Sequence, residues 1–171
     1  MRRNAIPAVP VLLVLVTLVM AGCRGGPAPD RQLLTEAERT AIADTLRRIS
    51  REASQTFDSD LDCAEIADRL PISEGFAGFV AQGRLMELGG RDDMVAMCRA
   101  VKQDRLSAHE EIDEQIVEVL SREAAFVVTR GVYTVNFTDG RTSSRSQVVT
   151  TLWARPAEGW QMVHLHESWP P

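Results

Sequence analysis

Near its end the chain reads Trp160-Gln-Met-Val-His-Leu-His-Glu-Ser168, which we predict to be the last strand of a sheet. Before it, Pro156–Gly159 marks a turn, and residues 143–155 have the composition of another long strand. Asp139-Gly140 is a turn signal of the hairpin type, and it follows a long predicted strand over residues 124–138. The end of the chain therefore predicts an antiparallel meander.

A long amphipathic helix is predicted near residue 35. Thr35 and Glu38 have the spacing of a capping box, which satisfies free backbone amides at the start of a helix. Apolar residues then recur at helical spacing, at Ile42, Leu46, Ile49 and Ala53. We expect this helix to run to about Thr56, where Asp58-Ser-Asp60 breaks it.

Shorter elements are predicted between this helix and the meander. Residues 62–70 favour a short helix ended by Pro71, and residues 76–88 favour two short strands around a turn near Gln82-Gly83. A third helix begins at Asp92 or Asp93, and an irregular strand with period-two alternation follows over residues 112–120. Helices that precede an antiparallel sheet predict an α+β domain, with the helices packed on one face of a curved sheet.

The first residues have the pattern of an export signal. Arg2 and Arg3 precede an apolar run over residues 11–20, and this run is too short for a membrane-spanning helix, which needs about 20 apolar residues. The next residues, Val19-Met20-Ala21-Gly22-Cys23, resemble the lipobox of bacterial lipoproteins. Residues 1–22 are therefore expected to be a lipoprotein signal peptide. The alternative is an ordinary secretory signal followed by a chance cysteine.

Cys23 is accordingly predicted to carry acyl chains, such as palmitate, that anchor the protein to a membrane of the cell envelope. Residues 23–31 are rich in glycine and proline, which predicts a flexible tether before a domain over residues 32–171. Arg24 follows the cysteine, and the resemblance to sorted lipoproteins then implies the outer membrane, facing the periplasm, if the host has two membranes.

Charge and cysteine content narrow the possible partners. The formal net charge is −5 at pH 7 and no basic run is present, so we predict no nucleic-acid binding. Cys63 and Cys98 could pair in a disulfide in an exported protein, or remain buried free thiols, and the sequence leaves both possibilities open.

The end of the chain resembles the NTF2-like superfamily, in particular SnoaL-like domains and the association domain of calcium/calmodulin-dependent kinase. Residues 160–168 are similar to the closing strand of those domains, which has Gly-x-Trp, apolar residues, His-x-His and Ser. Val149-Thr-Thr-Leu-Trp153 fits the family's Thr-x-x-Trp pattern, and residues 124–133 fit the long strand before it. The resemblance implies a cone-shaped α+β fold, often dimeric through its sheet. The superfamily hosts isomerases, dehydratases and oligomerisation hubs, so the resemblance does not fix the function.

His164 and His166 lie two apart on one predicted strand, so strict alternation places them on one face with Trp160, Met162 and Ser168. If that face lines the cone, His166 could serve as acid or base with Ser168 as its hydrogen-bond partner. The alternative, which we favour, is a buried polar network that fixes the strand. No third ligand has a suitable spacing for zinc, so neither a metal nor a cofactor is predicted.

Arg130 lies in the middle of an apolar strand. The resemblance implies that it lines the pocket and meets a carboxylate, although the second arginine of that pocket corresponds to Thr151 here. The alternative is a structural pair with Glu114 or Glu118. The candidate pocket residues are Arg130, Thr151, Trp153, His164, His166 and Ser168.

Three functional hypotheses follow. The first is a non-catalytic envelope domain that binds a small molecule or another protein and forms a homodimer. The second is a lyase or isomerase that uses His166 as acid or base. The third is a homo-oligomerisation domain positioned by the lipid anchor.

Overall fold

The computed structural model describes residues 33–80 and 84–169. The predicted signal peptide, the lipidation site at Cys23, the tether and the turn near Gln82-Gly83 lie outside these residues. In chain order the elements are α2 (Glu36–Asp58), α3 (Cys63–Arg69), β1 (Ile72–Val80), β2 (Arg84–Leu88), α4 (Arg91–Lys102), β3 (Arg105–Val119), β4 (Ala124–Phe137), β5 (Thr142–Ala154) and β6 (Gln161–Ser168). No helix in the described part of the chain is long and apolar enough to cross a membrane.

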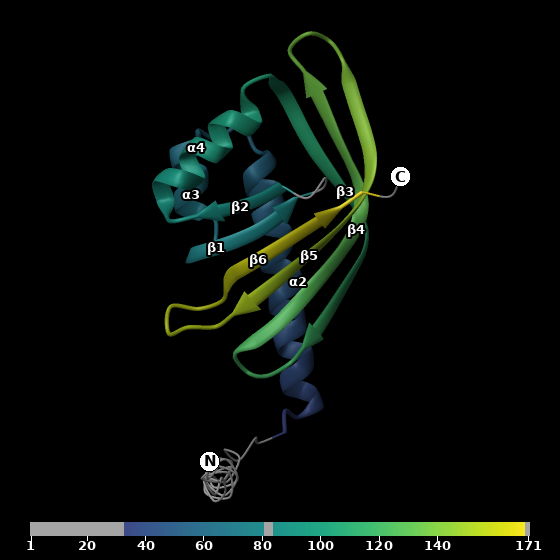
Figure 1. The fold of residues 1–171 in the computed structure, drawn as a ribbon. Helices are drawn as coiled ribbons and strands as arrows, with labels where there is room; N and C mark the ends of the chain where they lie inside the picture. The colour runs from purple at the N-terminus through teal and green to yellow at the C-terminus, as the bar shows by residue number, and fades with distance from the viewer. Residues whose placement is uncertain (1–32, 81–83, 170–171) are drawn as a thin grey trace, which may run out of the picture. The chain divides into compact units, whose positions relative to one another are not determined.

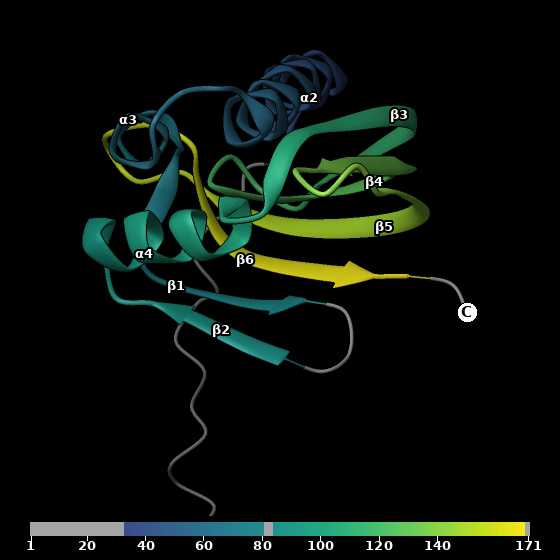
Figure 2. The ribbon, with the colours of Figure 1, turned by 90° about the horizontal axis from the view of Figure 1, so that it is seen from above.

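The strands form one curved sheet of six strands in the order β2-β1-β6-β5-β4-β3. Figures 1 and 2 show the helices gathered against one side of this sheet, with α2 lying along β3 to β5. The predicted α+β fold is therefore confirmed. The meander of β3 to β6 is also present, but β1 begins at Ile72 and pairs with β6 in parallel, so the sheet is wider than the sequence predicted. Met162 N–H donates to the Pro71 carbonyl at 2.7 Å, which joins the end of α3 directly to the sheet.

The capping box of α2 is present as predicted. Glu38 N–H donates to Thr35 Oγ1 at 3.2 Å, and Thr35 N–H donates to Glu38 Oε2 at 2.8 Å. The hydrogen bond from the Thr35 backbone and a contact with Arg122 lower the pKa of Glu38 to about 2. The predicted helical face is buried at Ile42, Leu46 and Ala53. The helix runs on to Asp58, because Ser59 caps it there through Thr56.

Two apolar cores hold the domain together. In the larger one, α2 packs on the inner face of the sheet, and Leu46, Val127 and Trp153 are fully buried. The smaller one joins α3 to α4 around Cys63, Ile66, Val95 and Cys98. Burial of side chains of this size contributes about 1.5 to 3 kcal/mol each.

Irregular pairing in β3 and β6 controls which residues face inward. The register between β3 and β4 shifts between Ile112 and Glu114, and the register between β5 and β6 shifts beside Trp153. Gly131 lies opposite the shift in β3, and a Cβ at this position would come within 2.2 Å of the Glu111 carbonyl oxygen. A glycine is therefore needed where the two backbones approach closely.

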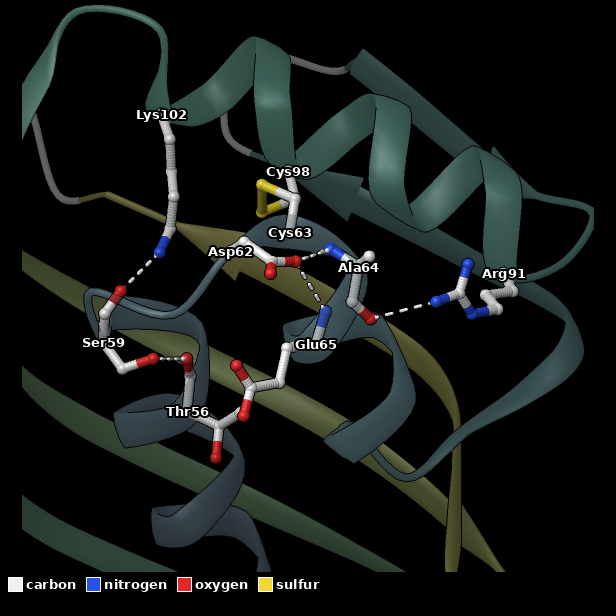
Figure 3. The surroundings of a disulfide bond; sticks show 9 residues. All are labelled: Thr56, Ser59, Asp62, Cys63, Ala64, Glu65, Arg91, Cys98 and Lys102. Carbon is white, nitrogen blue, oxygen red and sulfur yellow. Dashed lines mark hydrogen bonds between the residues drawn. A yellow bond between two sulfur atoms is a disulfide. The ribbon is translucent and has the colours of Figure 1, made fainter.

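Cys63 and Cys98 form a disulfide, one of the two possibilities that the sequence left open. Figure 3 shows the bond between α3 and α4. Polar contacts support the same pair of helices on both sides of the bond. Arg91 donates to the Ala64 carbonyl at 3.3 Å and pairs with Asp68, while Lys102 Nζ donates to the Ser59 carbonyl. The segment after α2 and the end of α4 are thus held together.

The disulfide generates a stability prediction. It closes a loop with a sequence separation of 35 residues, and removing a link of this length should lower the free energy of unfolding by about 3 to 4 kcal/mol. The double variant Cys63→Ser with Cys98→Ser should therefore unfold at lower urea concentration than the oxidised protein. The oxidised protein treated with reductant serves as the matched control and should shift in the same direction. An unchanged urea midpoint in both samples would contradict the prediction.

Candidate functional site

Arg130 lies on the outer face of the sheet, away from α2. Its neighbours Val127 and Thr129 are buried, and strand alternation then directs Arg130 outward. The Arg130 side chain is 62% exposed and its Nη2 pairs with Glu114 Oε2 at 3.2 Å. Arg130 therefore does not take the pocket position that the resemblance implied. It forms the alternative, a structural pair with Glu114.

His164, His166 and Ser168 also lie on the outer face. Leu165 pairs with Thr151 but Met162 pairs with Trp153, so β6 carries one extra residue between these positions. Such a bulge reverses the alternation beyond it. Strict alternation predicted that His164 and His166 share a face with Met162, and this prediction is wrong. His166 and Ser168 are exposed. Because the amino-acid pattern gives no signal for this bulge, sequence reasoning placed the two histidines on the opposite side.

Thr151 and Trp153 face inward but belong to the core. The Trp153 indole N–H donates to Thr151 Oγ1 at 2.8 Å, and both side chains are buried. The hydrogen bond satisfies the polar atom of a fully buried tryptophan. These two residues hold β5 under α2, and neither lines the cavity described below.

A polar cluster lies on the inner face beyond the apolar core, where α2 ends. Arg105 Nη1 donates to the Tyr133 hydroxyl at 2.8 Å, and this hydroxyl donates to Asp58 Oδ1 at 2.8 Å. Burial raises the pKa of Asp58 above its ordinary value of 3.8, against the opposing effect of the Tyr133 hydrogen bond. Burial and the nearby Asp58 carboxyl also raise the pKa of Tyr133. Three elements, α2, β3 and β4, thus each supply one member.

One helical turn before Asp58 the same face carries a second polar group. Ser54 on α2 donates to Glu110 on β3, and Gln147 Nε2 on β5 donates to the other carboxylate oxygen at 2.8 Å. Glu110 pairs with Tyr133 across β3 and β4, so the two groups adjoin. We call Ser54, Asp58, Arg105, Glu110, Tyr133 and Gln147 together the inner polar cluster.

Arg145 extends this cluster toward the end of β6. It pairs with Tyr133 across the strands, its Nη2 lies 3.4 Å from Glu167 Oε1, and its guanidinium stacks on Trp169. Burial lowers the pKa of Arg145. Its Nε is buried and has no hydrogen-bond partner within the described residues.

A cavity of about 200 Å³ opens beside Asp58 and Arg105. Its walls come from two segments, the end of α2 with the following loop and the end of α4 with the start of β3. The lining residues are Phe57, Asp58, Ser59, Asp60, Leu61, Lys102, Arg105, Leu106, Ser107 and Ala108. Burial lowers the pKa of Lys102, which lies in the wall. This cavity and the inner polar cluster form the candidate site.

Sequence reasoning did not find this site. In the sequence Asp58 belongs to a helix-breaking segment, and Tyr133 is the single tyrosine of the chain. The members come from positions far apart in the sequence, so no local motif marks them. Within residues 33–80 and 84–169, no group of three or more His, Cys, Asp or Glu side chains is placed to hold a metal ion.

The family profile of the calcium/calmodulin dependent protein kinase II association domain matches residues 82–171, more than half of the chain. The chain belongs to this family. No functionally curated protein matches the chain.

Solved structures with this fold agree with the assignment. The association domain of C. elegans CaMKII superposes with a TM-score of 0.58 at 17% identity, covering 78% of this chain and 99% of that chain. An NTF2-like superfamily protein from Salmonella enterica superposes with a TM-score of 0.61 at 18% identity, covering 81% of this chain and 94% of that chain. A type 2 hexachlorocyclohexane dehydrochlorinase superposes with a TM-score of 0.67 at 10% identity, covering 80% of this chain and 90% of that chain. At these identities the likeness shows the NTF2-like fold alone.

The raised pKa of Asp58 gives a pH-dependent prediction. The protonated carboxyl favours the folded state, so this contribution is complete below the ordinary value of 3.8 and is lost as pH rises through the folded pKa. Asparagine stays neutral, and its amide oxygen can still accept from Tyr133. Asp58→Asn should therefore gain stability relative to the unchanged protein as the pH rises.

Urea unfolding from about pH 3 to about pH 7 measures this difference. Asp92→Asn, at an exposed position in α4, controls for the loss of one negative charge. A stability difference between Asp58→Asn and the unchanged protein that stays constant over the whole range would refute the prediction.

Proposed function

We propose that this protein is a lipid-anchored envelope lipoprotein whose NTF2-like domain binds a small molecule without transforming it. The observation that carries the proposal is the cavity of about 200 Å³, whose lining includes Asp58, Lys102 and Arg105. Ligand sites are typically concave, partly apolar, and equipped with a few polar groups that fix the orientation of the ligand. In the described part of this chain, that combination occurs at the end of α2.

The anchor is proposed from the leader and receives support from the disulfide. Arg2, Arg3, the apolar run and the small residues before Cys23 match the pattern of an exported lipoprotein. The Cys63–Cys98 disulfide suits an oxidising compartment. We therefore propose attachment to a membrane through the lipid, in the outer membrane facing the periplasm if the host has two membranes.

The positions of the polar groups favour binding over catalysis. Both histidines of the closing strand lie on the outer face, so His166 has no access to the cavity. The Tyr133 hydroxyl both donates to Asp58 and accepts from Arg105, so its hydrogen-bonding capacity is already engaged. A relative is described as a putative scytalone dehydratase, and a lyase here would have to use Asp58 in place of His166.

Native mass spectrometry of the whole chain, exported and purified in mild detergent, tests the proposal. We expect a co-purified small molecule that is lost in Arg105→Ala, because Arg105 lines the cavity. Arg130→Ala is the matched control, since its exposed ion pair contributes about 0 to 1 kcal/mol and lies on the other face. Circular dichroism of Arg105→Ala checks that ligand loss does not reflect unfolding.

The same spectra report the anchor, because acyl chains on Cys23 add a defined mass that Cys23→Ser removes. Retention of the small molecule in Arg105→Ala, or its loss in Arg130→Ala, would place the binding site elsewhere. An unacylated intact mass from a lipoprotein-processing host would refute the anchor alone.

A homodimer is the second function that a specific observation favours. On the outer face, Phe126 pairs with Leu152 and Val128 pairs with Ile116, which forms an apolar patch of four side chains across β3, β4 and β5, beside Glu118 and Thr150. Ile116 is 51% exposed and Leu152 is 37% exposed. Large exposed apolar surfaces mark protein interfaces. We propose that a second copy of the chain covers this patch.

Sedimentation of the whole chain in mild detergent tests the dimer. Leu152→Lys should give a monomer, because it places a charge in the patch that the second copy would bury. Leu120→Lys changes an exposed leucine outside the patch and should leave the dimer intact. A monomer for the unsubstituted chain at about 100 μM would exclude a stable homodimer, since specific dimers of this kind form well below that concentration.

A further inference from the structure

Four charged side chains line the cavity, two of each sign. Asp58 and Asp60 come from the end of α2 and the loop that follows, and Lys102 and Arg105 come from the end of α4 and the start of β3. The formal charges of these four groups cancel. The cavity therefore presents an acidic wall and a basic wall to one shared volume.

These opposite charges attract one another, Lys102 with both aspartates and Arg105 with Asp58, but in the described part of the chain they form no direct ion pair. Within the described residues, neither Lys102 nor Arg105 forms an ion pair with Asp58 or Asp60 at 4.0 Å or less. Their recorded hydrogen bonds go elsewhere: Lys102 donates to the Ser59 carbonyl, and Arg105 and Asp58 share the Tyr133 hydroxyl. An ammonium has three donors, a guanidinium five and a carboxylate two oxygens, so capacity remains on both walls.

The rest of the lining is apolar and the volume is small. Phe57, Leu61 and Leu106 contribute the hydrophobic part of the lining. A volume of about 200 Å³ corresponds to roughly seven water molecules at about 30 Å³ each. It suits a short-chain organic molecule rather than a nucleotide or a peptide.

We propose that the cavity binds a small zwitterion, with its ammonium group against Asp58 and Asp60 and its carboxylate against Lys102 and Arg105. A simple anion would compete with Asp58 and Asp60 for the basic side chains, and a simple cation would compete with Lys102 and Arg105 for the carboxylates, whereas a zwitterion offers a partner to both signs. A neutral apolar molecule would compensate neither wall. This assignment rests on the proposed ligand-binding function and names the chemical class that the site takes.

A disulfide and a hydrogen bond tie the two walls together. Cys63 closely follows the Phe57–Leu61 segment and Cys98 precedes Lys102, so the disulfide ties the acidic wall to the basic wall. Figure 3 shows the hydrogen bond from Lys102 to the Ser59 carbonyl near this disulfide. Walls fixed in this way need little ordering on binding, which favours affinity for a ligand of matching charge separation.

Isothermal titration of the whole oxidised chain in mild detergent tests the assignment. The probes are glycine, β-alanine and 5-aminopentanoate, which place the two charges progressively further apart. Pentanoate and pentylammonium each carry one of the two charges. We expect one zwitterion to bind at least roughly tenfold more tightly than both single-charge compounds, because charge-assisted hydrogen bonds form at both ends.

Two variants and two matched controls localise the binding. Asp60→Asn and Lys102→Met should each weaken the bound zwitterion roughly tenfold. Asp92→Asn and Arg99→Met, both exposed on α4 outside the cavity lining, should leave its affinity unchanged. Asp60 is exposed, so its substitution is compatible with folding even if Lys102→Met is unstable.

The outcomes separate this inference from the proposed function. Equal binding of pentanoate or pentylammonium, or affinity that Asp60→Asn leaves unchanged, would overturn the zwitterion while leaving a ligand-binding cavity. Absence of binding by all three zwitterions up to about 10 mM would also overturn it, whereas a co-purified molecule of another class would still support the proposed function. If no zwitterion binds and no small molecule co-purifies, the proposed function is overturned as well.

Discussion

The packing of α2 against the inner face of the sheet is the contact on which the rest of the domain depends. Leu46 on the helix and Val127 and Trp153 on the sheet are fully buried, and the sheet has no other long helix on this face in the described chain. Beyond Ala53 the inward face of the helix turns polar, and so does the sheet beneath it. One helix thus covers an apolar core along most of its length and a polar cluster at its end.

That change of character explains why the candidate site lies where it does. Asp58 and Glu110 are partly buried carboxyl groups, and each needs hydrogen-bond donors that the apolar core cannot supply. Tyr133 and Gln147 provide those donors from the sheet, and Arg105 brings a positive charge beside them. The cavity opens next to this cluster, between the loop after α2 and the start of β3.

The sequence was sufficient where a local rule decides the structure. The capping box at Thr35 and Glu38, the apolar face of α2 and the turn at Asp139-Gly140 depend only on neighbouring residues, and all three are present. For the closing strand, the predicted direction of the side chains was wrong, because an extra residue in β6 reverses the direction of His164 and His166.

The site itself could not be predicted because nothing local defines it. Asp58, Arg105 and Tyr133 are separated by long intervals and meet only after the sheet has curved under α2. The same limit applied to the disulfide, since the positions of Cys63 and Cys98 in two helices do not report the distance between them. Arg130 shows the opposite risk: a match to a family pattern implied a pocket, while the alternation of β4 directs the side chain outward.

Alternation along the strands also separates the two proposed activities. On β5, Thr151 faces the core under α2 and Leu152, the next residue, faces outward in the apolar patch. On β4, Thr129 and Arg130 divide in the same way. A ligand in the cavity would contact only β3 of this sheet, at Arg105–Ala108, whereas a second copy would contact outward residues of β3, β4 and β5.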